Sequence, residues 1–475
     1  MKGIKIAFGI FKIPAILILL LFCGIGSISA QQNFYDTDQL PPSFHQQRRD
    51  LLRKKLGPST CAVIFANPIR NRSNDVDFQY SQDPDFCYLT GLLEPNSVLF
   101  IFSEPVSFKG AMIDELIYVQ DRDLKKEVWN GRRLGIEGVK EKLQFKTVVS
   151  GKQWKDSPPP VETFNKVLVK YPTDIREKSG ASGSLNTMAS LLKETLQEAG
   201  KEFAAGSLMN ALASLRQIKT PEEIVLMQKA VDITLQGLSE AIKACKPGMT
   251  EYQAQAIVEF YFKHMGSEYP GYGSISGSGI NSCVLHYVTN RKVLEPNDML
   301  LMDMGAEYHG YTADVTRTVP VDGTFSEEQK AIYNLVLEAQ LAGIEKAVKG
   351  NRFNDPNQAA KDVIAKGLVK LGIISKPEQS GTYFNHGTSH YLGLEVHDPG
   401  LYGQLEPGMV ITVEPGIYIP EGSDCDKKWW NIGVRIEDDV LITESQPFVM
   451  SDALPKTIEA LEDLMQQQTL FDQIK

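Results

Sequence analysis

Four carboxylates that lie within or beside apolar, strand-like segments constrain most strongly what the second half of this chain can form. They are Asp303, Asp314, Glu414 and Glu437. An unpaired carboxylate in an apolar interior is very costly, so each of these side chains needs a cation or several hydrogen-bond donors. A hairpin around residues 307–310, with His309 in its solvent-exposed turn, would bring Asp303 and Asp314 side by side. The sequence therefore predicts a site at which several carboxylates face one point.

A pair of divalent metal ions explains these four carboxylates most economically, because two such ions carry the positive charge that neutralises them. One imidazole, that of His390, would complete a mostly oxygen ligand shell. Such a shell suits Mn²⁺ or another hard divalent ion better than the thiolate- and imidazole-rich shells of structural zinc. Two metals about 3.5–4 Å apart activate a water molecule and polarise a carbonyl group, so the predicted chemistry is hydrolytic.

Each acid considered alone has a plainer interpretation as a turn residue or as an ion-pair partner of Arg317 or Arg435. The metal hypothesis therefore depends on the whole set and on its order. Other catalytic classes lack their motifs, because the chain contains neither HExxH nor GxSxG and no CxxC pair. The glycine-rich segment 277–282 lacks the third glycine of a dinucleotide fingerprint, so we reject that interpretation.

The first thirty residues have the pattern of a secretory signal peptide. Lys2, Lys5 and Lys12 precede an apolar run at 13–25, and small residues follow up to Ala30. The run is shorter than the roughly 20 residues that a membrane span needs. We expect cleavage after Ala30 and export of the mature chain, periplasmic or secreted, with an uncleaved anchor as the alternative.

The charge of the chain disfavours two classes of partner. Its formal net charge is −10 at pH 7, and cleavage of the signal peptide would remove three lysines and no acidic residue. Such an acidic chain is a poor electrostatic match for nucleic acids and for anionic membranes. We therefore expect no nucleic-acid partner and no stable membrane association of the mature protein.

The mature chain is expected to form two domains, of which the first spans residues 31–215. Apolar runs at 98–102 and 116–120 have the pattern of buried strands. A helical pattern follows at 188–214. This mixture indicates an α/β domain.

The second domain is expected to span residues 216–475. Capping-box sequences predict helices that begin after Thr220, Thr250 and Ser326. Strand-like runs lie between and after these helices, at 299–304, 311–319, 409–413 and 432–443. The pattern predicts an antiparallel sheet covered by helices, which is an α+β arrangement.

The segments that carry these acids resemble the pita-bread metallopeptidases, and most closely their aminopeptidase P (Xaa-Pro aminopeptidase) branch. The matching segments of the second half are 278–287, 302–308, 310–318, 386–398, 412–418 and 433–439. Segments 83–91 and 129–135 look like the N-terminal domain of that family. The resemblance covers essentially the whole mature chain. It implies an aminopeptidase P/creatinase-like α/β domain at 31–215 and a catalytic α+β pita-bread domain at 216–475.

The resemblance also implies roles for individual side chains. Asp314 and Glu437 would bridge two metal ions, and Glu414 would carry a proton to the leaving prolyl nitrogen, which must be protonated to leave. His286 and His397 would stabilise the tetrahedral intermediate. The implied metal ligands are Asp303, Asp314, His390, Glu414 and Glu437. The implied substrate contacts are His286, His386, His397, Tyr418 and Arg435.

By this resemblance the chain is an exported aminopeptidase with two divalent metal ions, expected to be Mn²⁺, and a metal-bridging hydroxide as nucleophile. It would hydrolyse the bond between an N-terminal residue and a following proline in peptides. A prolidase, which cleaves Xaa-Pro dipeptides on the same fold, is the nearest alternative, and a non-catalytic peptide-binding module is a more distant one. The family commonly forms dimers or tetramers, so a homo-oligomer is expected, and Trp129 matches an aromatic side chain that can reach a neighbouring subunit's site.

Overall fold

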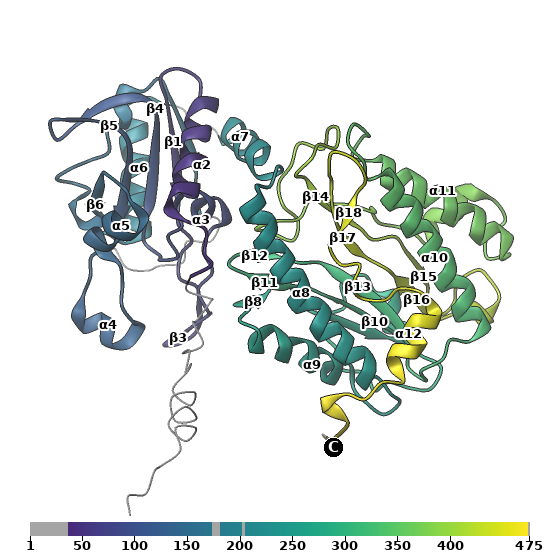
Figure 1. The fold of residues 1–475 in the computed structure, drawn as a ribbon. Coiled ribbons are helices and arrows are strands. Elements are labelled where there is room, and N and C mark those ends of the chain that lie inside the picture. Colours follow the sequence, from purple (N-terminus) through teal and green to yellow (C-terminus); the bar gives the residue numbers. More distant parts are fainter. Residues whose placement is uncertain (1–36, 173–180, 202–204, 474–475) are drawn as a thin grey trace, which may run out of the picture. The chain divides into compact units, whose positions relative to one another are not determined.

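The computed structural model of the chain describes residues 37–172, 181–201 and 205–473 (Figure 1). The expected signal peptide, residues 1–30, lies outside the described residues. Among the helices that are described, none combines the length and the apolarity that a bilayer-spanning helix requires.

The first half contains a five-stranded sheet with the order β6-β5-β4-β1-β7. Its strands are β1 (Thr60–Phe65), β4 (Val98–Phe108), β5 (Ala111–Val119), β6 (Val148–Ser150) and β7 (Lys166–Lys170). β1 pairs antiparallel with β4 and parallel with β7, so the sheet is mixed. The other elements are α2 (Pro42–Lys55), the hairpin β2 (Asn71–Ser73) and β3 (Val76–Asp77), α3 (Pro84–Thr90), α4 (Leu124–Asn130), α5 (Gly135–Leu143), α6 (Leu185–Glu198) and α7 (Gly206–Arg216). The predicted α/β architecture of this half is confirmed.

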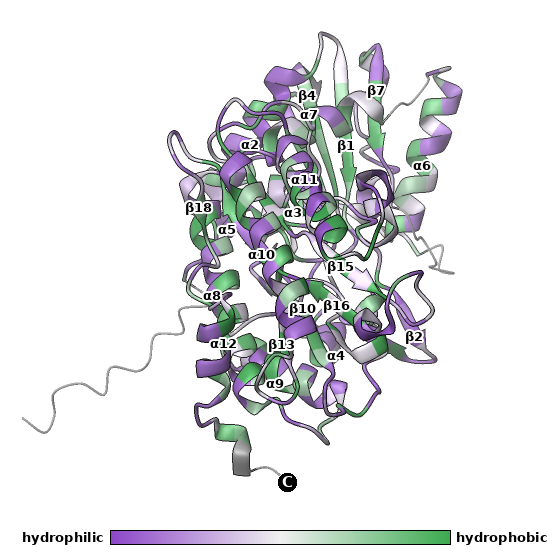
Figure 2. Cartoon of the chain, turned by 90° about the vertical axis from the view of Figure 1, so that its right-hand side faces the viewer, coloured by the Kyte–Doolittle hydropathy of each residue, from purple (hydrophilic) through white to green (hydrophobic). Residues whose placement is uncertain are grey.

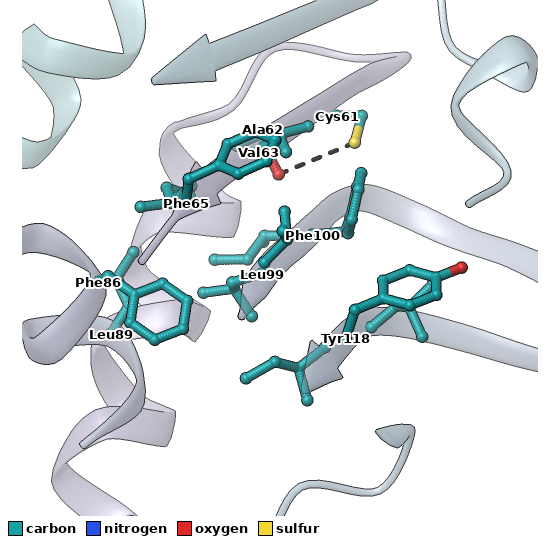
Figure 3. Packing of buried hydrophobic residues seen from close by; sticks show 14 of the residues in the cluster. Cys61, Ala62, Val63, Phe65, Phe86, Leu89, Leu99, Phe100 and Tyr118 are labelled. Atoms are coloured by element: carbon teal, nitrogen blue, oxygen red, sulfur yellow. Dashed lines mark hydrogen bonds between the residues drawn. The ribbon is translucent and has the colours of Figure 1, made fainter. Parts of the chain in front are cut away.

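The core of this sheet explains why its strands have nearly continuous apolar sequences. Every residue of β1 is buried, because elements pack against both faces of the central strands. Figure 3 shows side chains of β1, β4 and α3 meeting in this core, among them Phe65, Phe86 and Phe100. In Figure 2, β1 and β4 are largely green, whereas α6 carries both green and purple residues, as expected for a helix with one apolar face.

The helical segment predicted at 188–214 forms two helices instead of one. Helix α6 ends at Glu198, and α7 begins at Gly206. Gly200, just after α6, has a φ of 60°, a left-handed conformation that a glycine adopts without steric strain. The periodicity alone did not reveal this break.

The second half is built from antiparallel strand pairs, as predicted, and every strand pairing described there is antiparallel. The strands are β8 (Tyr269–Pro270), β9 (Ile275–Ser278), β10 (Met299–Met304), β11 (Ala306–Tyr308), β12 (Tyr311–Thr312), β13 (Val315–Pro320), β14 (Val410–Val413), β15 (Gly416–Ile419), β16 (Ile432–Arg435), β17 (Asp438–Leu441) and β18 (Phe448–Val449). The helices are α8 (Pro221–Ala244), α9 (Glu251–His264), α10 (Glu327–Lys346), α11 (Asp355–Lys370) and α12 (Ile458–Met465). Figure 1 shows α8 crossing the strands, and it contacts β11, β12 and β13, whereas α10 contacts β14, β15 and β16.

The three predicted capping boxes all begin helices where expected. In α8, the hydroxyl of Thr220 accepts from the amide of Glu223, whose carboxylate accepts from the Thr220 amide at 2.9 Å. Ser326 forms the same reciprocal pair with Gln329 at the start of α10. At the start of α9, Oε1 of Gln253 accepts from the amide of Thr250 at 2.8 Å, and the amide of Gln253 donates to the carbonyl of Thr250. These predictions are confirmed because a capping box is a local motif whose partners lie three residues apart.

The predicted hairpin between the two aspartates is present as β11 and β12. His309 and Gly310 form its two-residue turn with φ values of 50° and 84°, which is the pattern of a type I′ turn. Our expectation that His309 is exposed was wrong. Its side chain is only 5% exposed, and its Nδ1 lies 3.2 Å from Oε1 of Glu268.

Two predicted strands are interrupted at acids of the predicted metal site, Asp314 and Glu437. The segment 311–319 divides into β12 and β13 at Asp314, and the segment 432–443 divides into β16 and β17 at Glu437. The backbone amide of Asp314 donates to the carboxylate of Asp439 at 3.1 Å, and the amide of Glu437 donates to the carbonyl of Thr316. These long-range bonds replace the regular hydrogen bonds between strands. The side chains of Asp314 and Glu437 therefore do not follow the alternating directions of side chains along a strand.

The hairpin also carries a buried acid that predicts a pH effect on stability. Burial, and then the charge of Glu268, raises the pKa of Glu307 to about 7, compared with about 4.3 in an unfolded chain. The folded state therefore binds this proton more tightly, and the stability that it contributes is lost as the pH rises from about 4.5 to about 7. We expect Glu307→Gln to raise the free energy of unfolding by about 1–3 kcal/mol at pH 8 and to change it little at pH 4.5. Urea denaturation at both pH values measures this difference, and an equal effect at the two would contradict it.

Candidate metal centre

A cavity of about 540 Å³ lies among the strands of the second half. It is lined by Tyr272, Gly273, Ile275, Leu285, His286, Val288, Asp303, Asp314, His386, Gly387, Ser389, His390, Val396, His397, Glu414, Arg435 and Glu437. This set includes all five expected metal-ligand side chains and all three expected substrate-binding histidines. Of the expected site residues, only Tyr418 is absent from the lining.

Asp303, at the end of β10, is held by two donors from different parts of the chain. The hydroxyl of Tyr272 donates to its Oδ1 at 2.6 Å, and a guanidinium nitrogen of Arg435 contacts its Oδ2. A charge-assisted contact of this kind orients a carboxylate. Gly305, two residues later, allows the carbonyl of Ala313 to approach so closely that a Cβ there would collide with it. The strands that carry Asp303 and Asp314 can therefore lie very close together.

Asp314 and His390 face each other in the cavity. Oδ2 of Asp314 lies 3.3 Å from Nε2 of His390, which is also 3.4 Å from Oε1 of Glu414. The other ring nitrogen, Nδ1, lies 3.0 Å from the carbonyl oxygen of Tyr391 and donates to it. This arrangement turns Nε2 toward the carboxylates, as in histidines that bind metals.

The pKa values of this cluster are shifted first by burial and then by the charges of neighbouring groups. Burial raises the pKa of Glu414 to about 7, and burial with the charge of Asp314 raises the pKa of Glu437 well above its usual range. Burial would lower the pKa of His390, but its hydrogen bond to Asp314 and the charge of Glu414 outweigh burial and raise it to about 9. A bound cation would supply the positive charge that the cluster lacks and would compete with the proton on His390.

The donor set fits a hard divalent cation. Ligand atoms of Asp314, His390 and Glu437 all lie within 4.8 Å of one another. The set combines carboxylate oxygens with one imidazole nitrogen and includes no thiolate, which suits Mn²⁺ and similar ions. Asp303 and Glu414 line the same cavity, so further oxygen ligands are within the same space.

Two histidines of the cavity are neutral near pH 7. Burial, and then the charge of Arg435, lowers the pKa of His386 to about 4. Burial and the neighbouring His390 also lower the pKa of His397, whose ring centroid lies 4.3 Å from that of His390. A neutral imidazole donates from one nitrogen only. In His386 this proton goes to the carbonyl of Gly387, which lies 2.7 Å from Nδ1, so of the two rings His397 is the one that can donate to a substrate carbonyl.

Tyr418 lies beside the cavity and connects two of its side chains. Its hydroxyl accepts from Nη1 of Arg435 at 2.9 Å and lies 2.8 Å from Nε2 of His386. Tyr418 therefore contacts the cavity through His386 and Arg435, although the resemblance predicted it as a substrate contact. The Arg435 side chain joins this group to Asp303.

The residue after His397 fixes the loop that carries this histidine. The carboxylate of Asp398 is buried and accepts from Nη2 of Arg216 at 2.5 Å and from Nζ of Lys219 at 3.0 Å. Asp85, also buried, lies 2.7 Å from Nη1 of Arg216, so two acids and two cations satisfy one another. The position of His397 therefore depends on the end of α7 and on the residues that follow it.

Sequence reasoning missed Tyr272, which contacts two of the acids. Its hydroxyl, with a single proton, lies 2.6 Å from Oδ1 of Asp303 and 2.5 Å from Oδ1 of Asp314 and can donate to either. Burial, and then the charge of Asp303, raises its pKa well above the usual range, so the phenol keeps its proton. A tyrosine in a glycine-rich turn gives no local signal, because its partners lie 31 and 42 residues away.

Comparison with known proteins places the chain among the metallopeptidases. The family described as "Metallopeptidase family M24" matches residues 225–444, and "Aminopeptidase P, N-terminal domain" matches residues 45–163. A Xaa-Pro aminopeptidase of Haemophilus influenzae is 36% identical over 439 residues, which cover 90% of this chain and 98% of that protein.

Two solved structures are similar over nearly their whole length. The aminopeptidase PepP of Pseudomonas aeruginosa has a TM-score of 0.81 and 32% identity, and the alignment covers 90% of this chain and 98% of that one. Aminopeptidase P from Escherichia coli with the inhibitor Pro-Leu has a TM-score of 0.80, with the same identity and the same coverage.

Proposed function

Because this chain belongs to metallopeptidase family M24, we propose that it removes the N-terminal residue from peptides that carry proline in the second position. The resemblance read from the motifs is confirmed, as are the two-part architecture and the assignment as a metallo-aminopeptidase that uses a divalent metal. Proline specificity is inferred from the Xaa-Pro aminopeptidases that it resembles. The observation that carries the proposal is the convergence of all five ligand-type side chains and three histidines on one cavity.

We propose that the cavity binds two divalent ions, with Mn²⁺ preferred. Asp303, Asp314, His390, Glu414 and Glu437 would hold them, with Asp314 and Glu437 shared between the two. Two ions would carry four positive charges, which balance the four carboxylates. When bound, they would supply a hydroxide nucleophile at neutral pH and would polarise the scissile carbonyl.

The side chains around the acids have separate tasks in the proposed reaction. His397, which is neutral, and His286 would donate to the peptide and to the oxyanion that develops at the attacked carbonyl. Arg435 keeps Asp303 oriented, and Tyr272 holds Asp303 and Asp314 at a fixed spacing. Each of these contacts reduces the reorganisation needed during the reaction.

The leaving group requires one further proton. A prolyl nitrogen leaves a tertiary amide and has to be protonated as the bond breaks. Glu414 lines the cavity, and its Oε1 also lies 3.4 Å from the hydroxyl of Thr412. We assign the proton transfer to Glu414, because it lines the cavity and matches the residue with this role in the aminopeptidase P family.

A paired hydrolysis assay tests the proposed function. Metal-stripped mature protein would receive Mn²⁺, Zn²⁺ or Co²⁺ and then a Xaa-Pro-Xaa tripeptide or a Xaa-Pro dipeptide. We expect metal-dependent release of the first residue from the tripeptide, with Mn²⁺ giving the highest rate. Cleavage confined to the dipeptide would identify a prolidase, and no cleavage of either would favour a non-catalytic peptide-binding module.

We also propose that the protein forms a homo-oligomer. Helix α4 buries none of its residues, and its apolar side chains Leu124, Val128 and Trp129 are 72%, 82% and 86% exposed. Such an apolar face is typical of a surface that another chain covers. A monomeric mass in static light scattering would contradict this proposal.

Export of the mature chain is the last part of the proposal. It depends on the lysines, the apolar run and the small residues of 1–30. Cell fractionation, with mass spectrometry of the mature N-terminus, tests it. A chain recovered in the cytoplasm with its first thirty residues intact would contradict export.

A further inference from the structure

Glu251, the first residue of helix α9, is a buried acid that accepts five hydrogen bonds from one neighbouring segment. Its side chain is 0% exposed. Oε1 accepts from the amide of Ser278 at 2.7 Å and from two side chains, the hydroxyl of Ser278 and Nδ2 of Asn281, each at 3.0 Å. Oε2 accepts from the hydroxyl of Tyr287 at 2.9 Å and from the amide of Lys292 at 2.8 Å. Two of these five donors are backbone amides, which can only donate.

These five donors span the segment 278–292, which carries His286. The first three lie at its beginning, Tyr287 directly follows His286, and Lys292 lies at its end. His286 and its neighbours Leu285 and Val288 line the metal cavity. One carboxylate outside the cavity therefore holds both ends and the middle of a loop that forms one of its walls.

A second anchor lies just before the end of this segment and is arranged differently. The side chain of Asn290 accepts from the amide of Ser276 at 3.0 Å and donates to Gln255 of α9 at 2.9 Å. Asn290 has a φ of 51°, so the chain turns sharply there. Between Tyr287 and this anchor the loop is exposed, as Val288 shows with 57% exposure. Leu285 and Tyr287, which flank His286, pack against a small apolar cluster. The hydrogen bonds to Glu251 and Asn290 add to this packing and fix the course of the segment.

We propose that Glu251 is a positioning residue, which fixes the segment 278–292 so that His286 faces the substrate above the metal centre. The proposal deepens the proposed function and rests on it, because His286 is placed here as a peptide-binding side chain. A buried carboxylate without a neighbouring cation is costly, and it is stable only where preorganised donors surround it. The start of a helix adds a favourable dipole. If the segment 278–292 moved away, the buried Glu251 side chain would lose its hydrogen-bond donors, which costs free energy. Burial of Glu251 thus favours the one conformation of the segment that supplies these donors.

The variant Glu251→Gln tests this coupling with almost no change in shape. The new NH₂ group must face the donors on one of the two former carboxylate oxygens. A hydroxyl can reverse and accept from it, but a backbone amide cannot, so the bond from the amide of either Lys292 or Ser278 is lost. The matched control is Glu327→Gln, because Glu327 occupies the same place after the capping box of α10 but has an 88% exposed side chain. Tyr287→Phe is a milder second variant, which removes one of the five bonds and leaves the others.

Hydrogen–deuterium exchange of the metal-loaded, full-length protein is the first measurement. In Glu251→Gln we expect amides of 278–292 to exchange at least tenfold faster, while amides of β10 exchange as in the wild type. A merely structural role would instead accelerate exchange in β10 as well. Unchanged exchange of 278–292 in both Glu251→Gln and Tyr287→Phe would overturn the proposal.

Kinetics with a Xaa-Pro-Xaa tripeptide are the second measurement. We expect Glu251→Gln to lower kcat/KM about tenfold or more, through a higher KM and a lower kcat, because His286 is placed here as a donor to the peptide and to the oxyanion. Metal content should be unchanged, and Glu327→Gln should be indistinguishable from wild type. Faster loop exchange with unchanged KM and kcat would show that the loop is anchored but that His286 is not positioned by it, which overturns the proposal. If the wild type itself does not cleave the tripeptide, the proposed function fails, whereas the exchange data still decide whether Glu251 anchors the loop.

Discussion

Replacing Asp314 with alanine is expected to lower kcat by about a thousandfold or more and to reduce the bound metal. Asp314 faces His390 at 3.3 Å and accepts from Tyr272 at 2.5 Å, so its carboxylate lies at the middle of the ligand set. Polarisation of a carbonyl by bound metal is worth several kcal/mol, and each 1.4 kcal/mol, roughly, is a factor of ten in rate. Steady-state kinetics together with metal analysis of the dialysed protein measure both losses.

The same substitution is not expected to destabilise the metal-free protein. Burial, and then the charge of Asp303, raises the pKa of Asp314, which shows that its ionised form is disfavoured when no cation is present. We therefore expect metal-free Asp314→Ala to melt no lower than the metal-free wild type. The wild type should gain stability on addition of Mn²⁺, and the variant should gain much less.

A matched control separates this result from a general effect of losing an acid. Asp362 is an exposed aspartate on α11, and Asp362→Ala should keep wild-type kinetics and metal content. If Asp314→Ala retained two metal ions per chain and wild-type turnover, the dinuclear arrangement proposed for this cavity would be wrong.

Replacing Arg317 with methionine is expected to lower the free energy of unfolding by about 3–5 kcal/mol at neutral pH. Arg317 is 0% exposed and donates to the carboxylate of Asp438 at 2.8 Å and to the carbonyl of Glu437 at 2.7 Å. It also donates to the carbonyls of Leu454 and Pro455, so one side chain joins β13 to two other segments. Methionine fills similar space but leaves these acceptors without their donor.

The pH dependence of this loss follows from Asp438. Burial would raise its pKa, but the charges of Arg317 and Lys456 outweigh burial and hold it well below its usual range. The stability from this ionised carboxylate is present above the unfolded pKa of about 3.9 and is lost as the pH falls below it. The effect of Arg317→Met should therefore be full at pH 7.5 and smaller at pH 3.5.

Urea denaturation of the metal-free protein at these two pH values measures the effect without a contribution from bound metal. The control is Arg352→Met, because Arg352 is an exposed arginine and its loss should change the free energy of unfolding by less than about 0.5 kcal/mol. Equal losses in the two variants would show that the buried pair with Asp438 does not stabilise the fold.

Features that depend on near neighbours could be predicted from the sequence. The capping boxes at Thr220, Thr250 and Ser326 each use partners three residues apart, and β10 occupies the predicted range 299–304. The hairpin turn at His309 and Gly310 also follows from adjacent residues. The order and type of most elements were therefore accessible before the structure.

Features that depend on distant partners could not be predicted in the same way. The strand breaks at Asp314 and Glu437 arise from hydrogen bonds to Asp439 and Thr316, more than one hundred residues away in the chain. The five ligand-type residues were found only because together they form a recognisable set of motifs. Tyr272 was not part of any motif that the sequence analysis identified. The boundary between residues 215 and 216, and the signal peptide at 1–30, stay predictions.

The interlocking of distant segments at Asp314 and Glu437 has a consequence for the order of folding. The bond between Thr316 and Glu437 joins residues 121 positions apart, whereas each capped helix depends on local contacts. Closing long loops costs chain entropy, so such contacts form late, after local structure. The hydrolytic centre would then be the last part of the second half to mature. A nascent or partly folded chain would then lack the assembled site. It would not hydrolyse peptides until the second half had folded completely.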